Sequence, residues 1–120
     1  MTTFAIDYID SDWGDYRCIA IREVGAWRIV RGEDVVFRTK KPVTFVYDYP
    51  LNIECRRTHS ATMDGKWTRN RVAKLVKKDY LYIYDHEDTF GVWGHNLSDL
   101  VIESCTYNSK NRTLRFGIGS

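Results

Sequence analysis

The chain lacks the cysteine pairs of a zinc site or a redox motif. Its 120 residues include three cysteines, an odd number, at positions 18, 55 and 105, and they form no Cys-x-x-Cys spacing. Neither a disulfide framework nor a cysteine-based zinc site is therefore indicated. Each cysteine lies in an alternating, strand-like pattern, so we expect buried, inert thiols in a cytoplasmic protein.

Proline and glycine are also few, at two and eight residues, and the sequence has no repeat and no Ser/Gly-rich linker. No apolar stretch approaches the length of a membrane span. The first residues lack the basic region and the apolar run of a signal peptide. Because 43% of the residues are apolar, the chain has enough apolar material to close one core. The sequence predicts a single domain over residues 1–120, with no membrane association.

Acidic and basic residues are segregated into separate segments of the chain. Their charges nearly cancel, so the formal net charge is only +2. Residues 1–16 hold four acids and no base, and residues 79–103 hold six acids and no lysine or arginine. Between them, residues 56–78 hold eight bases and one acid. One interpretation is that the opposite blocks neutralise each other on the folded surface. The alternative is that they meet charged partners.

Short segments in the first half alternate between apolar and polar residues, or are rich in β-branched and aromatic residues, as β-strands are. These segments are residues 4–8, 16–24, 27–31, 35–39 and 43–55. We expect residues 27–31 and 35–39 to form a hairpin about Gly32-Glu33-Asp34. Pro50 should lie at a sheet edge or at a break in the fifth segment, or open a short helical turn.

One helix is predicted over residues 67–86. Thr68 is a suitable N-cap, and Trp67 before it pairs with Val72 after it as a hydrophobic staple. Apolar residues then recur at helical spacing and define a buried stripe. The stripe consists of Val72, Leu75, Val76, Tyr80 and Ile83, and the opposite face carries Arg71, Lys74, Lys77 and Lys78.

A second hairpin ends the chain. Residues 100–107 and 112–118 have strand patterns on either side of a turn at residues 108–111. The segment before them, residues 88–99, is a predicted loop with glycines on both sides of Trp93. The order of strands, one helix and two strands predicts an α+β fold, in which an antiparallel β-sheet of about five to seven strands packs on one main α-helix.

Two groups of residues in the second half of the chain form a pattern that resembles one in a known family. They are Trp67-Thr68-Arg69 with Asp79-Tyr80 and Ile83-Tyr84, and Gly91-Val92-Trp93-Gly94-His95 with Asp99 to Glu103. This pattern resembles one in a family of small, uncharacterised proteins of phages, plasmids and other mobile elements. The resemblance implies no assigned activity. It favours a protein that binds a macromolecule of the host.

No arrangement of residues indicates catalysis, a metal or another cofactor. The three histidines, His59, His86 and His95, have no spacing that presents two imidazoles from one helix or tight loop. Asp79 falls on the apolar stripe of the predicted helix, where a carboxylate is costly unless it is paired. We expect an internal ion pair, with Arg69 or Arg22 as partner. A small enzyme that uses Asp79 or His95 as acid or base is the alternative.

Aromatic residues in loops are the strongest indication of a binding surface. The chain has four tryptophans and eight tyrosines, and Trp13 and Trp93 both lie beside glycine and acidic residues. Aromatic side chains next to fixed charge are typical of protein-binding hot spots. The predicted partner-binding residues are Trp93, His95, Phe90, Asp88 and Trp13. Alternatively, the two indoles close the open ends of the sheet.

The basic segment suggests a second kind of partner. Cations with an aromatic residue among them are the mixture that nucleic-acid surfaces use, and residues 56–78 contain both. Direct nucleic-acid binding through Arg71, Lys74, Lys77 and Lys78 is therefore an alternative.

Our leading hypothesis is a non-enzymatic protein of mobile-element origin that docks on a host protein. The partner belongs to a nucleic-acid-handling complex in this hypothesis, because an acidic surface can compete for sites built for phosphate. In its specific form, this hypothesis is that the protein inhibits a defence system of the host, for example as an anti-CRISPR protein.

Overall fold

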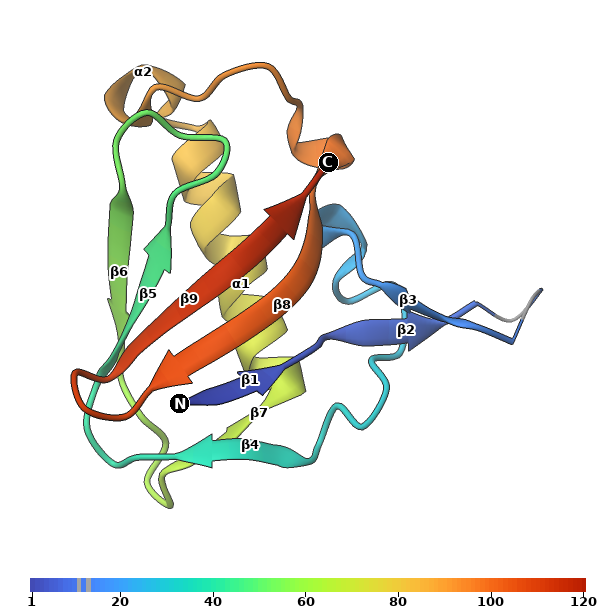
Figure 1. The fold of residues 1–120 in the computed structure, drawn as a ribbon, viewed down its shortest axis with the longest axis vertical. Coiled ribbons are helices and arrows are strands. Elements are labelled where there is room, and N and C mark those ends of the chain that lie inside the picture. Colours follow the sequence, from blue (N-terminus) through green and yellow to red (C-terminus); the bar gives the residue numbers. More distant parts are fainter. Residues whose placement is uncertain (11, 13) are drawn as a thin grey trace.

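A five-stranded sheet with α1 (Arg69–Tyr84) packed across it forms the body of the molecule (Figure 1), in a computed structural model that describes residues 1–10, 12 and 14–120. The strands, in spatial order, are β1 (Thr2–Phe4), β8 (Val101–Asn108), β9 (Thr113–Gly119), β5 (Val43–Tyr47) and β6 (Cys55–His59). The predicted α+β class, with one main helix on a sheet, is confirmed. The predicted antiparallel sheet is mixed, because β5 and β9, which lie far apart in the sequence, pair in parallel, whereas the other three pairs are antiparallel.

Two small strand pairs flank this sheet. β2 (Asp7–Ile9) pairs with β3 (Tyr16–Cys18), and β4 (Val35–Arg38) pairs with β7 (Lys66–Thr68). The predicted hairpin of residues 27–31 and 35–39 is therefore wrong. Phe37 of β4 stacks on Trp67 of β7, with ring centroids 5.4 Å apart. The long-range pairing of β4 with β7 places both rings in the buried core.

The predicted strand over residues 16–24 ends early. β3 stops at Cys18, and residues Ile21–Glu23 form a 3₁₀ turn, η1. Ile19 and Ile21 are both fully buried, so the apolar residues of this segment fill the core from a turn. The fifth predicted segment likewise breaks at Pro50, which separates β5 from β6.

Helix α1 begins and packs as its sequence predicts. The Thr68 side chain accepts a hydrogen bond from the backbone N–H of Arg71 at 3.2 Å, which caps the helix. Both residues of the predicted staple, Trp67 and Val72, are fully buried. The rest of the predicted stripe lies in or against the core, with Leu75 at its margin.

One end of the molecule gathers several short elements. After α1 come α2 (Glu87–Phe90) and η2 (Leu97–Asp99), and both lie at the same end as the β5–β6 connection and the C-terminus (Figure 1). The predicted loop of residues 88–99 is thus partly helical. Gly91 ends α2 in the left-handed region, with φ of 65°, and a Cβ there would clash with Asn52. None of the described helices has the length and apolar character needed to cross a membrane.

Trp67→Ala should lower the free energy of unfolding by about 3 kcal/mol or more, because it empties a fully buried site beneath the start of α1. The matched control is Lys74→Ala on the exposed face of the same helix, with an expected loss of less than about 0.5 kcal/mol. Urea denaturation of both variants measures the difference. Equal midpoints would contradict the staple.

Candidate binding surface

The segment that carries Trp93 is fixed by backbone hydrogen bonds to the β5–β6 connection. The Trp93 N–H donates to the Pro50 carbonyl at 3.0 Å, and the Ile53 N–H donates to the Phe90 carbonyl at 3.1 Å. Leu51 and Val92 form a β-bridge between these two contacts. The Trp93 side chain nevertheless leaves 47% of its surface exposed. The indole is therefore presented to solvent from a well-defined backbone.

Tyr49 and His95 support the Trp93 indole. The Tyr49 ring meets it edge-on, with centroids 5.5 Å apart, and the His95 ring lies 5.8 Å away. The Tyr49 hydroxyl is 2.9 Å from His95 Nε2 and 2.9 Å from the Ser120 hydroxyl. The Tyr84 hydroxyl donates to the His95 carbonyl at 3.0 Å. These contacts join α1, the β5–β6 connection and the C-terminus around one exposed ring.

Acidic side chains lie near Tyr84 of this group and near the adjacent Tyr80. Glu87 and Asp99 act on Tyr84, whose pKa is raised to about 12, mainly by burial and secondarily by these two carboxylates. Asp48 likewise adds to the effect of burial, which raises the pKa of Tyr80. Both tyrosines therefore lie close to negative charge. We call the set of Tyr49, Tyr84, Trp93 and His95, with the exposed acids Asp48, Glu87, Asp88 and Asp99, the aromatic–acidic end.

The structure brings only some of the predicted partner-binding residues together. Trp93 and His95 are neighbours, and Asp88 is exposed on α2. Phe90 instead packs against the core, with its ring 5.9 Å from that of Tyr82. Trp13 lies outside the described residues. Trp93 does not belong to the buried core, because its side chain is half exposed.

Tyr49 and Tyr84 were missed by the sequence analysis. Tyr49 follows β5 and is 46 residues from His95 in the chain, so no local pattern connects the two. Tyr84 ends α1 one turn beyond Tyr80 of the buried stripe, and spacing alone assigns it a packing role. In the sequence, this group is indicated only by the positions of Tyr49 and Tyr84, which lie within three residues of the acids Asp48 and Glu87.

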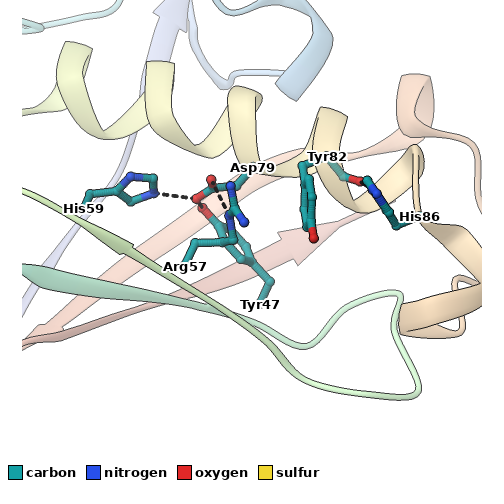
Figure 2. A network of polar contacts seen from close by, with 6 residues as sticks. All are labelled: Tyr47, Arg57, His59, Asp79, Tyr82 and His86. Carbon is teal, nitrogen blue, oxygen red and sulfur yellow. Dashed lines mark hydrogen bonds and ion pairs between the residues drawn. The ribbon is translucent and has the colours of Figure 1, made fainter.

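Asp79 is the second notable group, and it is fully buried between α1 and the sheet (Figure 2). The Tyr47 hydroxyl donates to Asp79 Oδ2 at 2.6 Å, His59 Nε2 lies 2.7 Å from the same oxygen, and Arg57 Nε lies 3.4 Å from Oδ1. The expected internal ion pair is present, but its predicted partners were wrong. The partners come from β5 and β6, because these strands lie under the middle of the helix.

Arg69 has another role. Its Nε donates to the Ala5 carbonyl at 2.8 Å, and its guanidinium lies over the Phe4 ring. This contact holds β1 against the start of α1. An arginine in the first helical turn opposes the helix dipole, and the contact with β1 compensates for that local cost.

A row of side chains in contact continues from the Asp79 cluster to the protein surface. The Arg57 guanidinium lies 4.2 Å from the centroid of the Tyr82 ring, and the Tyr82 ring lies 4.3 Å from that of His86. Figure 2 shows Tyr82 between Arg57 and His86. Because Tyr82 covers one face of the guanidinium and Asp79 binds its Nε, Arg57 is held in a fixed position.

The basic face of α1 is less free than the sequence predicts. The Arg71 guanidinium donates to the Ser60 carbonyl and lies over the Trp67 ring, 4.0 Å from its centroid. Burial lowers the pKa of Arg71. Lys77 Nζ donates to two backbone carbonyls of the η1 region. Of the four predicted residues, Lys74 and Lys78 are exposed, whereas Arg71 and Lys77 are partly buried.

The cysteines and histidines form no further site in the described part of the chain. Cys55 and Cys105 are buried as predicted, and burial raises the pKa of both thiols. Cys18 is exposed, which corrects that prediction, because the strand in which it lies belongs to the small β2–β3 pair. Among the described residues, no group of three or more His, Cys, Asp and Glu side chains could hold a metal ion.

Comparison with known proteins adds no relative. No family model, no curated protein and no solved structure matches the chain.

Asp79→Ala should lower the free energy of unfolding by about 3–5 kcal/mol, because it leaves Arg57, His59 and the Tyr47 hydroxyl without their shared acceptor. Asp85→Ala, which removes an exposed carboxylate at the end of the same helix, is the control and should change stability by less than about 0.5 kcal/mol. Chemical denaturation at pH 7 tests both. A loss for Asp79→Ala no larger than that of the control would show that the cluster contributes nothing to folding.

Stability should also fall at alkaline pH. Burial raises the pKa of Tyr47 and Tyr80, and that of Tyr84 is raised to about 12. Their contribution is complete below the unfolded pKa of about 10 and is lost as pH rises, because only the unfolded chain then releases these protons. The slope for a fully buried tyrosine is about 1.4 kcal/mol per pH unit. Unfolding curves between about pH 8 and pH 12 should show this decline, with a shallower slope for Tyr84→Phe. A flat profile would contradict the burial of these hydroxyls.

Proposed function

We propose that the chain is a non-enzymatic binding protein that docks on a host protein through the aromatic–acidic end. The observation that carries the proposal is the half-exposed indole of Trp93 on a backbone held by the β5–β6 connection. An aromatic side chain that is already fixed loses little conformational entropy when a partner buries it. Rings of this kind dominate the energy of protein interfaces.

Charge complementarity indicates the kind of partner surface. In the described part of the chain, none of the four acids of the aromatic–acidic end forms an ion pair. The opposite charge blocks thus do not neutralise these acids through direct contacts. A basic surface, such as one that binds nucleic acid in the partner, fits an end of the molecule that carries both an exposed aromatic residue and exposed carboxylates.

The resemblance to mobile-element proteins directs the proposal to a host partner. The residues that carry it include Trp93 and His95, which form the centre of the aromatic–acidic end. An inhibitor of a nucleic-acid-handling defence complex in the cytoplasm, for example of the anti-CRISPR type, is the specific form that we propose. The carboxylates then occupy a channel built for phosphate.

The positions of the two candidate catalytic residues support a binding role over an enzymatic one. Asp79 is fully buried, and its carboxylate already contacts three donors. His95 contacts the Tyr49 hydroxyl and thereby supports Trp93.

Trp93→Ala should weaken partner binding by at least about tenfold, or about 1.4 kcal/mol, and should change the free energy of unfolding by less than about 1 kcal/mol. The matched control is Trp27→Ala, which removes a second half-exposed indole, from a different segment of the chain. Immobilised wild type and both variants are incubated with nuclease-treated bacterial lysate, and the affinity of each retained protein is then measured by calorimetry after purification.

The proposal requires a protein that wild type and Trp27→Ala retain and Trp93→Ala loses, and that binds more weakly at high salt. In a plaque assay with a host that carries a CRISPR system, wild type should restore phage growth and Trp93→Ala should not. Equal retention by the two alanine variants would contradict the assignment of the surface. Phage growth unaffected by the wild type would contradict the anti-CRISPR form.

A further inference from the structure

A pocket of about 750 Å³ is lined by the first half of α1 and by the segment of residues 24–34 that leads to β4. Its lining includes Val24 and Ile29, which are buried, and Trp27, which leaves 50% of its surface exposed. This volume lies within the range of about 300–1,000 Å³ that is usual for small-molecule sites. The pocket shares no lining residue with the aromatic–acidic end.

The Trp27 indole is held in position at the pocket. Its ring lies against that of Tyr8, with centroids 5.7 Å apart, and its Nε1 donates to the Glu23 carboxylate at 3.1 Å. An indole that is fixed and half exposed offers a flat apolar surface for another ring. Base–aromatic stacking contributes about 1–3 kcal/mol per base in single-strand binding.

The free charge of the pocket is positive. Arg28, Lys74 and Lys77 line it, and in the described part of the chain none of the three forms an ion pair. Lys77 Nζ donates to the carbonyls of Arg22, at 3.2 Å, and of Val24, at 2.8 Å. An ammonium group has three N–H donors, so one remains for a ligand.

The two acids in the pocket lining already have partners. The Glu33 carboxylate accepts a hydrogen bond from the Asn70 side chain, and Asp34 pairs with Arg31 at 2.7 Å. Arg31 compensates the charge of Asp34, whereas Asn70 is neutral and leaves the charge of Glu33 in place. The three cations named above outnumber Glu33, so the electrostatic preference of the pocket is for an anion.

Contacts within the protein fix the wall of the pocket without a ligand. The Asn70 N–H donates to the Gly32 carbonyl at 3.0 Å, and a Cβ on Gly32 would clash with the Asn70 side chain. Next to it, Arg31 has φ of 53°, a left-handed conformation that costs a non-glycine residue about 1–2 kcal/mol. Such strain persists only where surrounding contacts hold it, and it is concentrated at ligand sites.

We propose that this pocket binds a nucleotide, with the base on the Trp27 indole and the phosphate at Lys74, Lys77 and Arg28. The joint presence of a fixed indole and uncompensated cations carries the proposal. A free mononucleotide and one nucleotide of a single strand share this chemistry. Of the four basic residues that the sequence suggested for nucleic acid, only Lys74 and Lys77 line the pocket.

The test uses two probes, AMP and a ten-residue oligothymidylate, added to the full chain at low salt. Heteronuclear NMR follows the indole N–H signals, which the variants assign, and calorimetry gives the affinities. Lys74→Ala and Trp27→Leu should each weaken binding of the preferred probe by about tenfold. Lys78→Ala is the matched control, because it removes an exposed lysine of the same helix outside the pocket, and should weaken binding by less than about twofold.

Each outcome is decisive. Binding of AMP with these variant effects supports a free nucleotide as ligand, and binding of oligothymidylate alone supports a single strand. Failure of both probes to shift the Trp27 signal would overturn the proposal. Equal losses for Lys74→Ala and Lys78→Ala, or equal binding of hexaglutamate, would show a general attraction for anions and would also overturn it. The docking function proposed above is unaffected, because none of these variants alters the aromatic–acidic end.

Discussion

The buried carboxylate of Asp79 is the interaction on which the arrangement of helix and sheet depends. A carboxylate under the middle of α1 is tolerated only if donors meet it, and these come from Tyr47 on β5 and from Arg57 and His59 on β6. The helix can therefore pack on these strands in one register and at one depth. Hydrophobic packing alone is less specific, since apolar groups have no preferred direction. The cluster thus fixes the position of α1 relative to β5 and β6, at the edge of the sheet.

The surface assigned to partner binding is connected to the Asp79 cluster through the residues that follow Tyr47 and Asp79 in the chain. Tyr47 is followed within three residues by Tyr49 and Pro50, and Pro50 holds the backbone of Trp93. On the helix side, the Tyr80 hydroxyl donates to the Tyr49 carbonyl at 2.7 Å. The connection that supports Trp93 is therefore tied to α1 one residue after Asp79. A loop without these contacts would present the same indole over a wider range of orientations and would bind more weakly.

The two proposed sites divide the charge of the chain between them. Glu87 and Asp99 lie near Tyr84 at the aromatic–acidic end, whereas Lys74 and Lys77 line the pocket beside Trp27. Each site combines a half-exposed indole with charge of one sign, and the two therefore select opposite partners. This separation explains how a small net charge of +2 coexists with strongly charged segments. A protein that contacts both a basic protein surface and a nucleotide fits a role at a nucleic-acid complex.

Local patterns predicted the parts of the fold that depend on nearby residues. Helix α1, its Thr68 cap and the final hairpin follow from spacing within a few residues, and the structure confirms them. The pairing of β4 with β7 and the parallel pairing of β5 with β9 join distant segments, which alternation cannot specify. The same limit applies to the sites. Helical periodicity placed Asp79 on the buried face, but its partners depend on the strand order. The exposure of Trp93 was predicted, whereas its support by Tyr49 needed the tertiary structure.

The central claim is that the Trp93 segment is a preformed surface held by the β5–β6 connection. Native-state hydrogen exchange of the Trp93 amide tests this most directly, because that N–H donates to the Pro50 carbonyl. We expect exchange at least about 100-fold slower than in an unstructured peptide, corresponding to about 2.7 kcal/mol of local opening energy. The Ile53 amide, which donates to Phe90, should be protected to a similar degree. Exchange of both amides at the rate of an unstructured chain would contradict the account.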